Sequence, residues 1–214
     1  MKQCVLTLAI SLALTSCMIP IGSKLAVAKP ASASPVTPST ANKAAPKYTG
    51  FDRTLTEHGV TFHVTSPNDG SINTLRIQPS GLKADNTVIE RQIEGTVTNA
   101  EVADLNVDGS PELYVYVTSA GSGSHGSLVA YAANKGKSLS EIYLPPMEED
   151  KAAAKGYMGH DEFAVVENTL VRRFPVYKDG DTNSQPTGGT RQIQYKLKAG
   201  EAGWILRPDK IVNY

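Results

Sequence analysis

The sequence predicts an all-β fold: an antiparallel β-sandwich or open barrel with one short helix. From about residue 48, short segments rich in Val, Ile, Leu, Thr and Tyr alternate with Gly, Asn, Asp and Pro. Apolar side chains recur at every second position in Leu113–Val117 and Ile193–Leu197, as in half-buried strands. Several connections are too short for a parallel crossover, so the strands must pair as antiparallel hairpins.

Ten strands are expected, at residues 59–65, 73–79, 87–95, 112–118, 127–133, 138–144, 162–168, 169–177, 191–197 and 203–212. The only stretch with a helical composition is residues 147–157, MEEDKAAAKGY, and it is short. No internal repeat interrupts this pattern. The strand-rich part of the chain, residues 48–214, is therefore expected to form one domain.

The N-terminal segment predicts export. Lys2 precedes an apolar run over 5–14 that is too short for a membrane-spanning helix. Residues 1–17 would be the signal peptide with its lipobox, and cleavage before Cys17 would make Cys17 the lipid-modified N-terminus. Ordinary signal peptidase would instead remove residues 1–28, ending at Ala28. Residues 18–47 are rich in Ala, Pro, Ser and Thr and form the expected linker.

Composition excludes some classes of partner. The formal net charge is zero, so neither nucleic acid nor an anionic membrane surface is an expected ligand. A membrane contact is expected only through the lipid on Cys17. Both cysteines, Cys4 and Cys17, lie in the leader, so the exported domain has no disulfide although it enters an oxidising compartment.

The stretch DLNVDGSPE contains the start of a calcium-loop pattern. Side-chain oxygens recur at Asp104, Asn106, Asp108 and Glu112. The twelfth position is Val115 instead of the usual Glu, and a strand follows in place of a helix. The favoured interpretation is a structural turn closed by Asp and Asn side chains around Gly109, and a Ca²⁺ site is the alternative. No other cofactor is expected.

The histidines form no zinc-like pattern; they are His58, His63, His125 and His160. His160 precedes Asp161 and Glu162, which allows an acid–base site, but a solvated loop is favoured because nothing aims these groups at a nucleophile. Arg172 and Arg173 are adjacent on an expected strand and must point to opposite faces.

The stretch SAGSGSHGS, residues 119–127, joins two expected strands through residues that are almost all small, with His125 among them. A loop of this kind on a rigid β scaffold is often a binding element. A second loop, between about residues 178 and 190, is longer than a hairpin needs and is a candidate second contact surface.

The segment from Asn99 to Leu128 resembles the central part of the PliI family, the periplasmic inhibitors of i-type (invertebrate-type) lysozyme. The shared features are an Asp/Asn–Gly turn, an acid before an apolar strand, and a loop that is Ser-Gly-x-Tyr in the family and Ser-Gly-x-His in this chain. The resemblance implies a PliI-like β domain over residues 48–214. It also implies an exported inhibitor, periplasmic or anchored to the outer membrane, without enzymatic activity, which protects peptidoglycan from a host lysozyme.

In that family, the Ser and the Tyr of the loop enter the active-site cleft of the lysozyme. The Ser matches Ser122, whereas the Tyr position falls on His125, a departure that leaves the type of lysozyme open. The remaining loop residues, expected to shape the loop, are Gly121, Gly123, Ser124 and Gly126. Because an exposed strand edge can pair with a strand of another chain, a homodimer is compatible with the predicted fold.

Two rival functions remain open at this stage. One is a calcium-stabilised adhesion or carbohydrate-binding β module built on the Asp104–Glu112 turn. The other is a hydrolase that uses His160 with Asp161 or Glu162.

Overall fold

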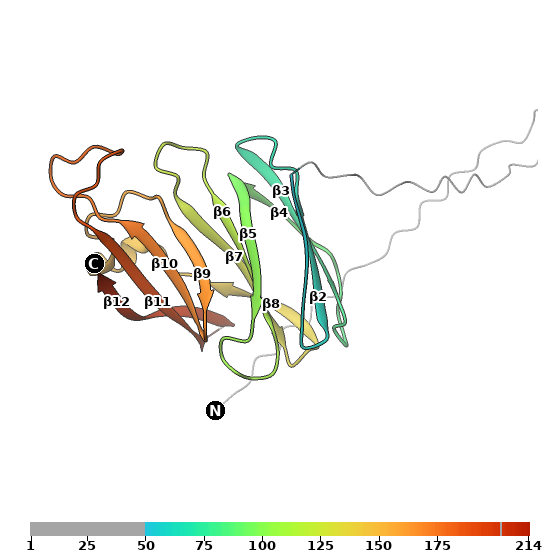
Figure 1. Ribbon diagram of the computed structural model, residues 1–214. Coiled ribbons are helices and arrows are strands. Elements are labelled where there is room, and N and C mark those ends of the chain that lie inside the picture. The colour runs from blue at the N-terminus through green and yellow to red at the C-terminus, as the bar shows by residue number, and fades with distance from the viewer. Residues whose placement is uncertain (1–49, 202) are drawn as a thin grey trace, which may run out of the picture. The chain divides into compact units, whose positions relative to one another are not determined.

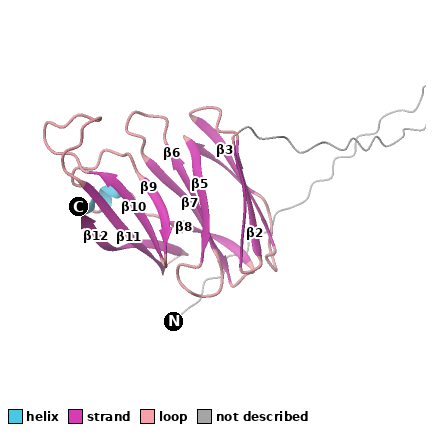
Figure 2. Ribbon diagram, viewed as in Figure 1, coloured by secondary structure: helices cyan, strands magenta, loops and turns pink. Residues whose placement is uncertain are grey.

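The computed structural model describes residues 50–201 and 203–214, which are almost entirely strands (Figure 2). The all-β prediction is therefore confirmed. The predictions for residues 1–49, namely the signal, Cys17 and most of the linker, lie outside the described residues. Among the described helices, none has the length and apolar character needed to cross a membrane.

The first sheet is a four-stranded antiparallel meander in the order β1-β2-β3-β4. Its strands are β1 (Phe51–Glu57), β2 (Val60–Ser66), β3 (Ile72–Ser80) and β4 (Ile89–Glu94). His58 and Gly59 connect β1 to β2 with φ angles of 48° and 79°. Positive φ at both central residues is the turn geometry that matches the twist of a two-residue hairpin.

The second sheet has eight strands in the order β5-β6-β7-β8-β12-β11-β10-β9. Its strands are β5 (Thr96–Ala103), β6 (Glu112–Thr118), β7 (Gly126–Asn134), β8 (Ser138–Tyr143), β9 (Glu162–Val166), β10 (Thr169–Pro175), β11 (Thr190–Ala199) and β12 (Trp204–Asn213). All neighbours pair antiparallel except β8 and β12, which pair in parallel. This parallel pair joins strands that are distant in sequence, so the short connections between neighbouring strands do not predict it.

All ten predicted strands are present, and two further strands, β1 and β5, were not predicted. β5 has the sequence TVTNAEVA, which contains Asn, Ala and Glu, residues that are depleted in strands. It nevertheless pairs with the strongly apolar β6, with a register shift between Val97 and Asn99. The pairing partner, and not the local composition, makes this segment a strand.

β6 is buried on both faces and separates two apolar cores. Leu113, Val115 and Val117 face the first core, which β6 shares with the four-stranded sheet. Tyr114 and Tyr116 face the second core, inside the curved eight-stranded sheet. Because side chains alternate along a strand, one apolar strand can serve both cores at once. Figure 1 shows β5, β6 and β7 between the four-stranded sheet and strands β9 to β12.

A carboxylate bridges the two edges of the eight-stranded sheet. Glu101 of β5 accepts hydrogen bonds from the backbone N–H of Val165 in β9, at 2.8 Å, and from the hydroxyl of Tyr116. The Tyr116 ring also stacks on Phe163 of β9, with ring centroids 5.6 Å apart. These contacts bring edge strands β5 and β9 together, so the sheet is a nearly closed barrel.

The predicted helical segment forms a 3₁₀ turn, Met147–Glu149, and a short helix α1, Lys151–Ala154. Asp150 caps α1, since its side chain accepts the N–H groups of Ala152 and Ala153, both at 3.0 Å. The Arg191 guanidinium donates to carbonyls at the other end of α1. Both ends of this short helix are therefore satisfied by side chains.

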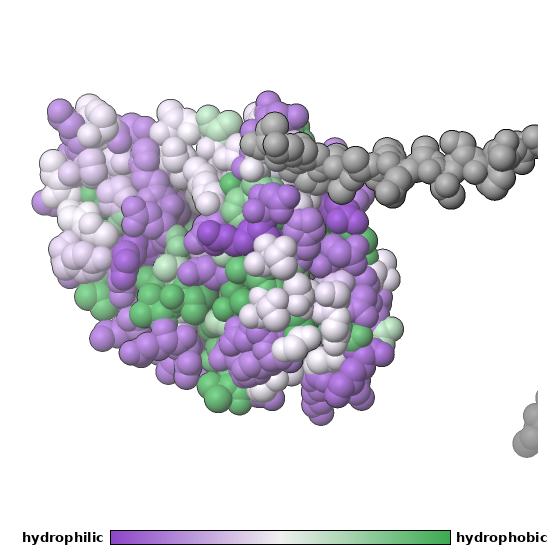
Figure 3. Space-filling model, turned by 45° about the vertical axis from the view of Figure 1, so that its right-hand side comes forward, coloured by the Kyte–Doolittle hydropathy of each residue, from purple (hydrophilic) through white to green (hydrophobic). Residues whose placement is uncertain are grey.

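Apolar surface gathers in the middle of one face, between hydrophilic areas (Figure 3). Large apolar side chains that are exposed come from several elements, among them Ile72, Val107, Tyr143, Met158, Val166, Ile211 and Tyr214. Single exposed apolar side chains are normal on monomeric proteins. The patch by itself therefore assigns no partner.

The bridge through Glu101 predicts a local stability effect. Glu101→Ala leaves the N–H of Val165 and the hydroxyl of Tyr116 without their acceptor, and we expect a loss of about 1–3 kcal/mol in the free energy of unfolding. Urea denaturation measures this loss, and faster hydrogen exchange in β9 localises it. Glu162→Ala, an exposed position on β9, is the control. Equal stability of the two variants would contradict a bridging role for Glu101.

Candidate functional site

The candidate loop, residues 119–125, joins β6 to β7 at one end of the domain (Figure 1). Gly121, Ser122 and His125 are exposed, whereas Gly123 and Ser124 are half-buried. The loop follows directly from β6, the strand buried on both faces. A short, largely exposed segment is therefore attached to a strand whose side chains lie in both apolar cores.

The loop has a defined conformation of its own. Ser124 donates its N–H to the carbonyl of Gly121 at 2.9 Å, with Ser124 itself at φ 43°. At the base, the N–H of Ser119 donates to the carbonyl of His125 at 2.9 Å, and the N–H of His125 donates to the Ser119 hydroxyl at 3.0 Å. The segment is thus a closed, hydrogen-bonded loop.

Two glycines, Gly123 in the loop and Gly126 directly after it, allow close packing. A Cβ on Gly123 would lie 2.4 Å from the His125 ring, and a Cβ on Gly126 would lie 2.6 Å from Asp161. By contrast, a Cβ on Gly121 would meet open space. Glycine therefore lets the loop fold against its own imidazole and against the segment that carries Asp161.

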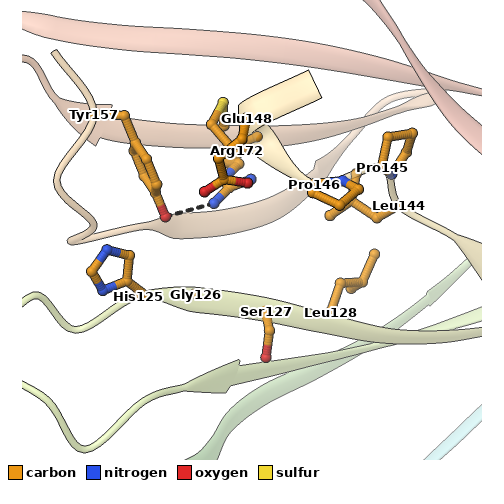
Figure 4. A pocket seen from close by; sticks show the side chains of 11 residues that line it. His125, Gly126, Ser127, Leu128, Leu144, Pro145, Pro146, Glu148, Tyr157 and Arg172 are labelled. Atoms are coloured by element: carbon orange, nitrogen blue, oxygen red, sulfur yellow. Dashed lines mark hydrogen bonds between the residues drawn. The ribbon is translucent and has the colours of Figure 1, made fainter. Parts of the chain in front are cut away.

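The His125 ring lies against Tyr157 and lines a cleft of about 310 Å³ beside the loop (Figure 4). The two rings meet edge to face, with centroids 5.6 Å apart. Apolar side chains that line the cleft come from Leu128 and from residues 144–147. Because the imidazole packs on the Tyr157 ring, its orientation is restricted before any partner arrives.

A buried ion pair supports the base of the loop. Arg172 of β10 donates its Nε–H to Asp161 at 2.7 Å, and the two side chains are 6% and 0% exposed. The other Asp161 oxygen accepts the N–H of Gly126 at 2.7 Å and the hydroxyl of Tyr157 at 2.7 Å. Arg172 also donates to the Tyr157 oxygen at 2.8 Å. One carboxylate thus connects the barrel interior, the loop base and the ring under His125.

Electrostatics keep Arg172 protonated in this cluster. Burial lowers the pKa of Arg172, but the hydrogen bond and the charge of Asp161 outweigh burial, so its pKa is raised above the usual value. Burial, followed by the hydrogen bond to Asp161, raises the pKa of Tyr157. Asp161 and Arg172 therefore form a satisfied pair whose removal from one side would leave an unpaired buried charge.

The expectation of a solvated loop at residues 160–162 is wrong for Asp161. Its side chain turns into the barrel, because Arg172 needs a counter-charge there. His160 points elsewhere, with Nε2 placed 3.2 Å from Oδ1 of Asn183. The structure does not bring His160 and Asp161 together as an acid–base pair. Arg172 and Arg173 do occupy opposite faces, as predicted, since Arg173 bonds Gln192 on the outer side.

The long loop between β10 and β11 contacts the candidate loop, a placement that the sequence did not reveal. Asn183 donates its side-chain N–H to the carbonyl of Ser122 at 2.8 Å. The N–H of His160 donates to the carbonyl of Gly123 at 2.7 Å. The only signal in the sequence was the unusual length of this loop.

The Asp104–Glu112 turn lies at the opposite end of the domain, where β5 leads into β6 (Figure 1). Asp104 accepts the N–H groups of Asp108 and Gly109, at 3.0 and 2.8 Å. Asn106 also accepts from Asp108, and Asp108 accepts from Ser110. The side-chain bonds expected of a structural turn are all present.

Carboxylates nevertheless converge at this turn. Oxygens of Asp104, Asp108 and Glu112 lie within 4.8 Å of one another. Glu112 is 1% exposed and accepts the N–H of Leu105 at 2.8 Å. Burial, with the nearby charges of Asp104 and Asp108, raises the pKa of Glu112 to about 8. A protonated carboxyl and a bound cation are two ways to neutralise such a group.

The remaining histidines have structural contacts on the first sheet. His63 pairs with Asp52 at 2.8 Å. His58 places Nδ1 2.9 Å from the carbonyl of Gly109, and this hydrogen bond raises its pKa. Neither residue belongs to the one carboxylate cluster found within residues 50–201 and 203–214.

The raised pKa of Glu112 predicts pH-dependent stability in metal-free buffer. Between about pH 5 and pH 8 the folded state retains a proton that the unfolded chain has lost, so stability falls as pH rises, by up to about 1.4 kcal/mol per pH unit. Glu112→Gln mimics the protonated form and should remove this slope. Urea denaturation across this pH range with a chelator present measures both proteins. A slope that persists unchanged in the variant would contradict the assignment to Glu112.

Comparison with known proteins supports the sequence resemblance. No curated protein and no solved structure matches the chain. The family model of PliI, described as periplasmic lysozyme inhibitor of I-type lysozyme, matches residues 82–155. The matched segment contains the Asp104–Glu112 turn, strands β6 and β7 and the whole candidate loop. The resemblance to the PliI family is therefore confirmed over residues 82–155, and that family is one of periplasmic inhibitors.

Proposed function

We propose that the protein inhibits an i-type lysozyme by placing the loop at residues 119–125 in the active-site cleft of the enzyme. The observation that carries this proposal is the loop itself. It is exposed, built from small residues, held in one conformation, and contained in the segment that matches the PliI model. The protein would act by stoichiometric blocking, without a reaction of its own.

The chemistry of a lysozyme cleft suits this loop. Glycosidases of this kind carry two carboxyl groups that flank the scissile bond. The hydroxyl of Ser122 and an N–H of the His125 imidazole are donors that such carboxyl groups can accept. Hydrogen bonds to an ionised carboxylate are stronger than neutral ones. A docked loop would also occupy the sugar subsites and keep substrate out.

Rigidity of the loop supports the same proposal. Ordering a loosely held segment on binding costs free energy that reduces affinity. Here the base is closed by Ser119 and His125, and Asp161 holds Gly126 from below. The cleft beside His125 offers room for a side chain of the partner next to the inserted loop. Little ordering would be needed at the moment of docking.

We also propose export to the periplasm or outer membrane, where such an inhibitor would meet its target. Residues 1–17 would be the signal with its lipobox, cleaved before Cys17, if Cys17 is lipid-modified, and residues 1–28 would be the signal if ordinary signal peptidase cuts. The linker to residue 47 would then hold the domain away from the membrane. Mass spectrometry of the exported protein distinguishes a lipidated Cys17 from an N-terminus at Lys29.

The proposal is tested by titrating residues 48–214 against i-type, chicken-type and goose-type lysozymes in a cell-wall clearing assay. Saturable inhibition of the i-type enzyme near one-to-one stoichiometry is the expected result. Inhibition of another type alone would reassign the target, which the His at the Tyr position of the family leaves open. No inhibition of any of the three would overturn the proposal.

The loop residues are tested by the double variant Ser122→Ala and His125→Ala. We expect inhibition to weaken at least about tenfold, because two donors to the cleft are lost, each worth roughly 1 kcal/mol or more. Inhibition constants measure the effect, and circular dichroism checks the fold. His63→Ala, on the first sheet, is the control and should inhibit normally. Unchanged inhibition by the double variant would exclude this loop as the docking element.

A second candidate function is a calcium-stabilised adhesion or carbohydrate-binding module, favoured by the convergence of three carboxylates at the Asp104–Glu112 turn. A cation that binds only the folded state raises the melting temperature by mass action. If this function holds, Ca²⁺ should raise the midpoint of the wild type and leave that of Asp108→Asn nearly unchanged. Thermal melts of both proteins with Ca²⁺ and with a chelator measure these midpoints. Equal midpoints of the wild type under the two conditions would exclude this candidate.

A further inference from the structure

We propose that Asn183 is a positioning residue that holds the inhibitor loop, as we now call the candidate loop of residues 119–125, in its docking conformation. Asn183 lies in the brace loop, which we define as residues 178–189 between β10 and β11. This inference rests on the proposed function and adds to it an element that the family match at residues 82–155 does not contain. In this proposal, the brace loop holds the inhibitor loop in the conformation that binds the lysozyme.

Two successive carbonyls of the inhibitor loop accept hydrogen bonds from residues outside it. The Asn183 side chain donates to the carbonyl of Ser122 at 2.8 Å, and the N–H of His160 donates to the carbonyl of Gly123 at 2.7 Å. The approach is close, because a Cβ on Gly159 would lie 2.0 Å from the Gly123 oxygen. These contacts set the orientation of two consecutive peptide planes at the tip of the loop.

Peptide geometry makes this orientation relevant to binding. The described chain contains no cis peptide bond, and in a trans peptide the N–H points opposite to the C=O. When Asn183 holds the Ser122 carbonyl inward, the N–H of Gly123 in the same peptide points away from the brace loop. A donor that already faces outward needs no reorganisation to meet a carboxylate. The brace therefore adds a backbone donor to the side chains of Ser122 and His125.

Asn183 is itself fixed in place. Its Oδ1 lies 3.2 Å from Nε2 of His160, which donates in the Nε2–H tautomer, and its carbonyl accepts the Tyr177 hydroxyl at 2.9 Å. The rings of His160 and Tyr177 stack with centroids 6.4 Å apart. The amide of Asn183 thus has one orientation, with its N–H toward Ser122.

The brace loop is closed by a second side chain, Asp181. Its carboxylate accepts the N–H of Lys178 at 2.7 Å, and the N–H and hydroxyl of Thr187 at 2.8 and 2.9 Å. These hydrogen bonds, led by that of Lys178, lower the pKa of Asp181. A loop that is ordered by its own contacts can act as a fixed support for its neighbour.

The test uses two variants and one control in the chain of residues 48–214. Asn183→Ala removes the whole contact. Asn183→Asp keeps the size and the acceptor for His160 but cannot donate to the Ser122 carbonyl. Gln185→Ala changes an exposed amide of the same brace loop and serves as the matched control.

We expect both Asn183 variants to melt at the wild-type temperature and to bind the lysozyme roughly three- to tenfold more weakly, the range of one lost hydrogen bond. Hydrogen exchange at the amides of Ser124 and His125 should accelerate in both variants before any lysozyme is added. Gln185→Ala should match the wild type in all three measurements. Wild-type exchange and wild-type affinity in the Asn183 variants would overturn the inference.

A double-mutant cycle separates positioning from direct contact. If Asn183 acts through the loop, its substitution should change affinity much less when Ser122 and His125 are already alanine. A full, additive loss in that background would show that Asn183 touches the lysozyme directly, and would overturn the positioning role. If the wild type inhibits no lysozyme, the proposed function fails, while the exchange rates still decide whether Asn183 holds the loop.

Discussion

The burial of β6 on both faces is the constraint on which the rest of the structure depends. Alternation along one strand sends Leu113, Val115 and Val117 into one core and two tyrosines into the other. The four-stranded sheet must cover the first set, and the eight-stranded sheet must curl around the second. The loop that follows β6 is consequently attached to a strand that cannot shift without disturbing both cores.

The Asp161–Arg172 pair transmits this rigidity to the candidate site. Two buried charges contribute little net stability, since desolvation offsets their attraction, but their geometry is demanding because neither can lose its partner. Because Asp161 must keep Arg172 as its partner, its carboxylate is held in place. The other carboxylate oxygen then accepts both the N–H of Gly126 and the Tyr157 hydroxyl. We infer that this pair serves the shape of the site more than the stability of the fold.

Most strands were predictable because their signal is local. Apolar alternation and flanking Gly, Asn or Pro placed ten of the twelve, and the composition of residues 147–157 placed the short helix. β5 was not predicted because its own composition does not favour a strand, and it is a strand because it pairs with β6. The parallel pairing of β8 with β12 was not predicted either, because about sixty residues separate the two strands in sequence and no local pattern indicates the pair.

The same division applies to the candidate sites. The sequence by itself determined the Asp104–Gly109 turn and the thin, Gly-rich loop, because their hydrogen bonds join residues only a few positions apart. Only the tertiary structure decided that Asp161 lies beneath Gly126, 35 residues away, and that Asn183 holds Ser122, 61 residues away. A carboxylate or an amide in a polar stretch has many compatible partners. Which one it meets depends on how the sheet curls and which strand ends come together.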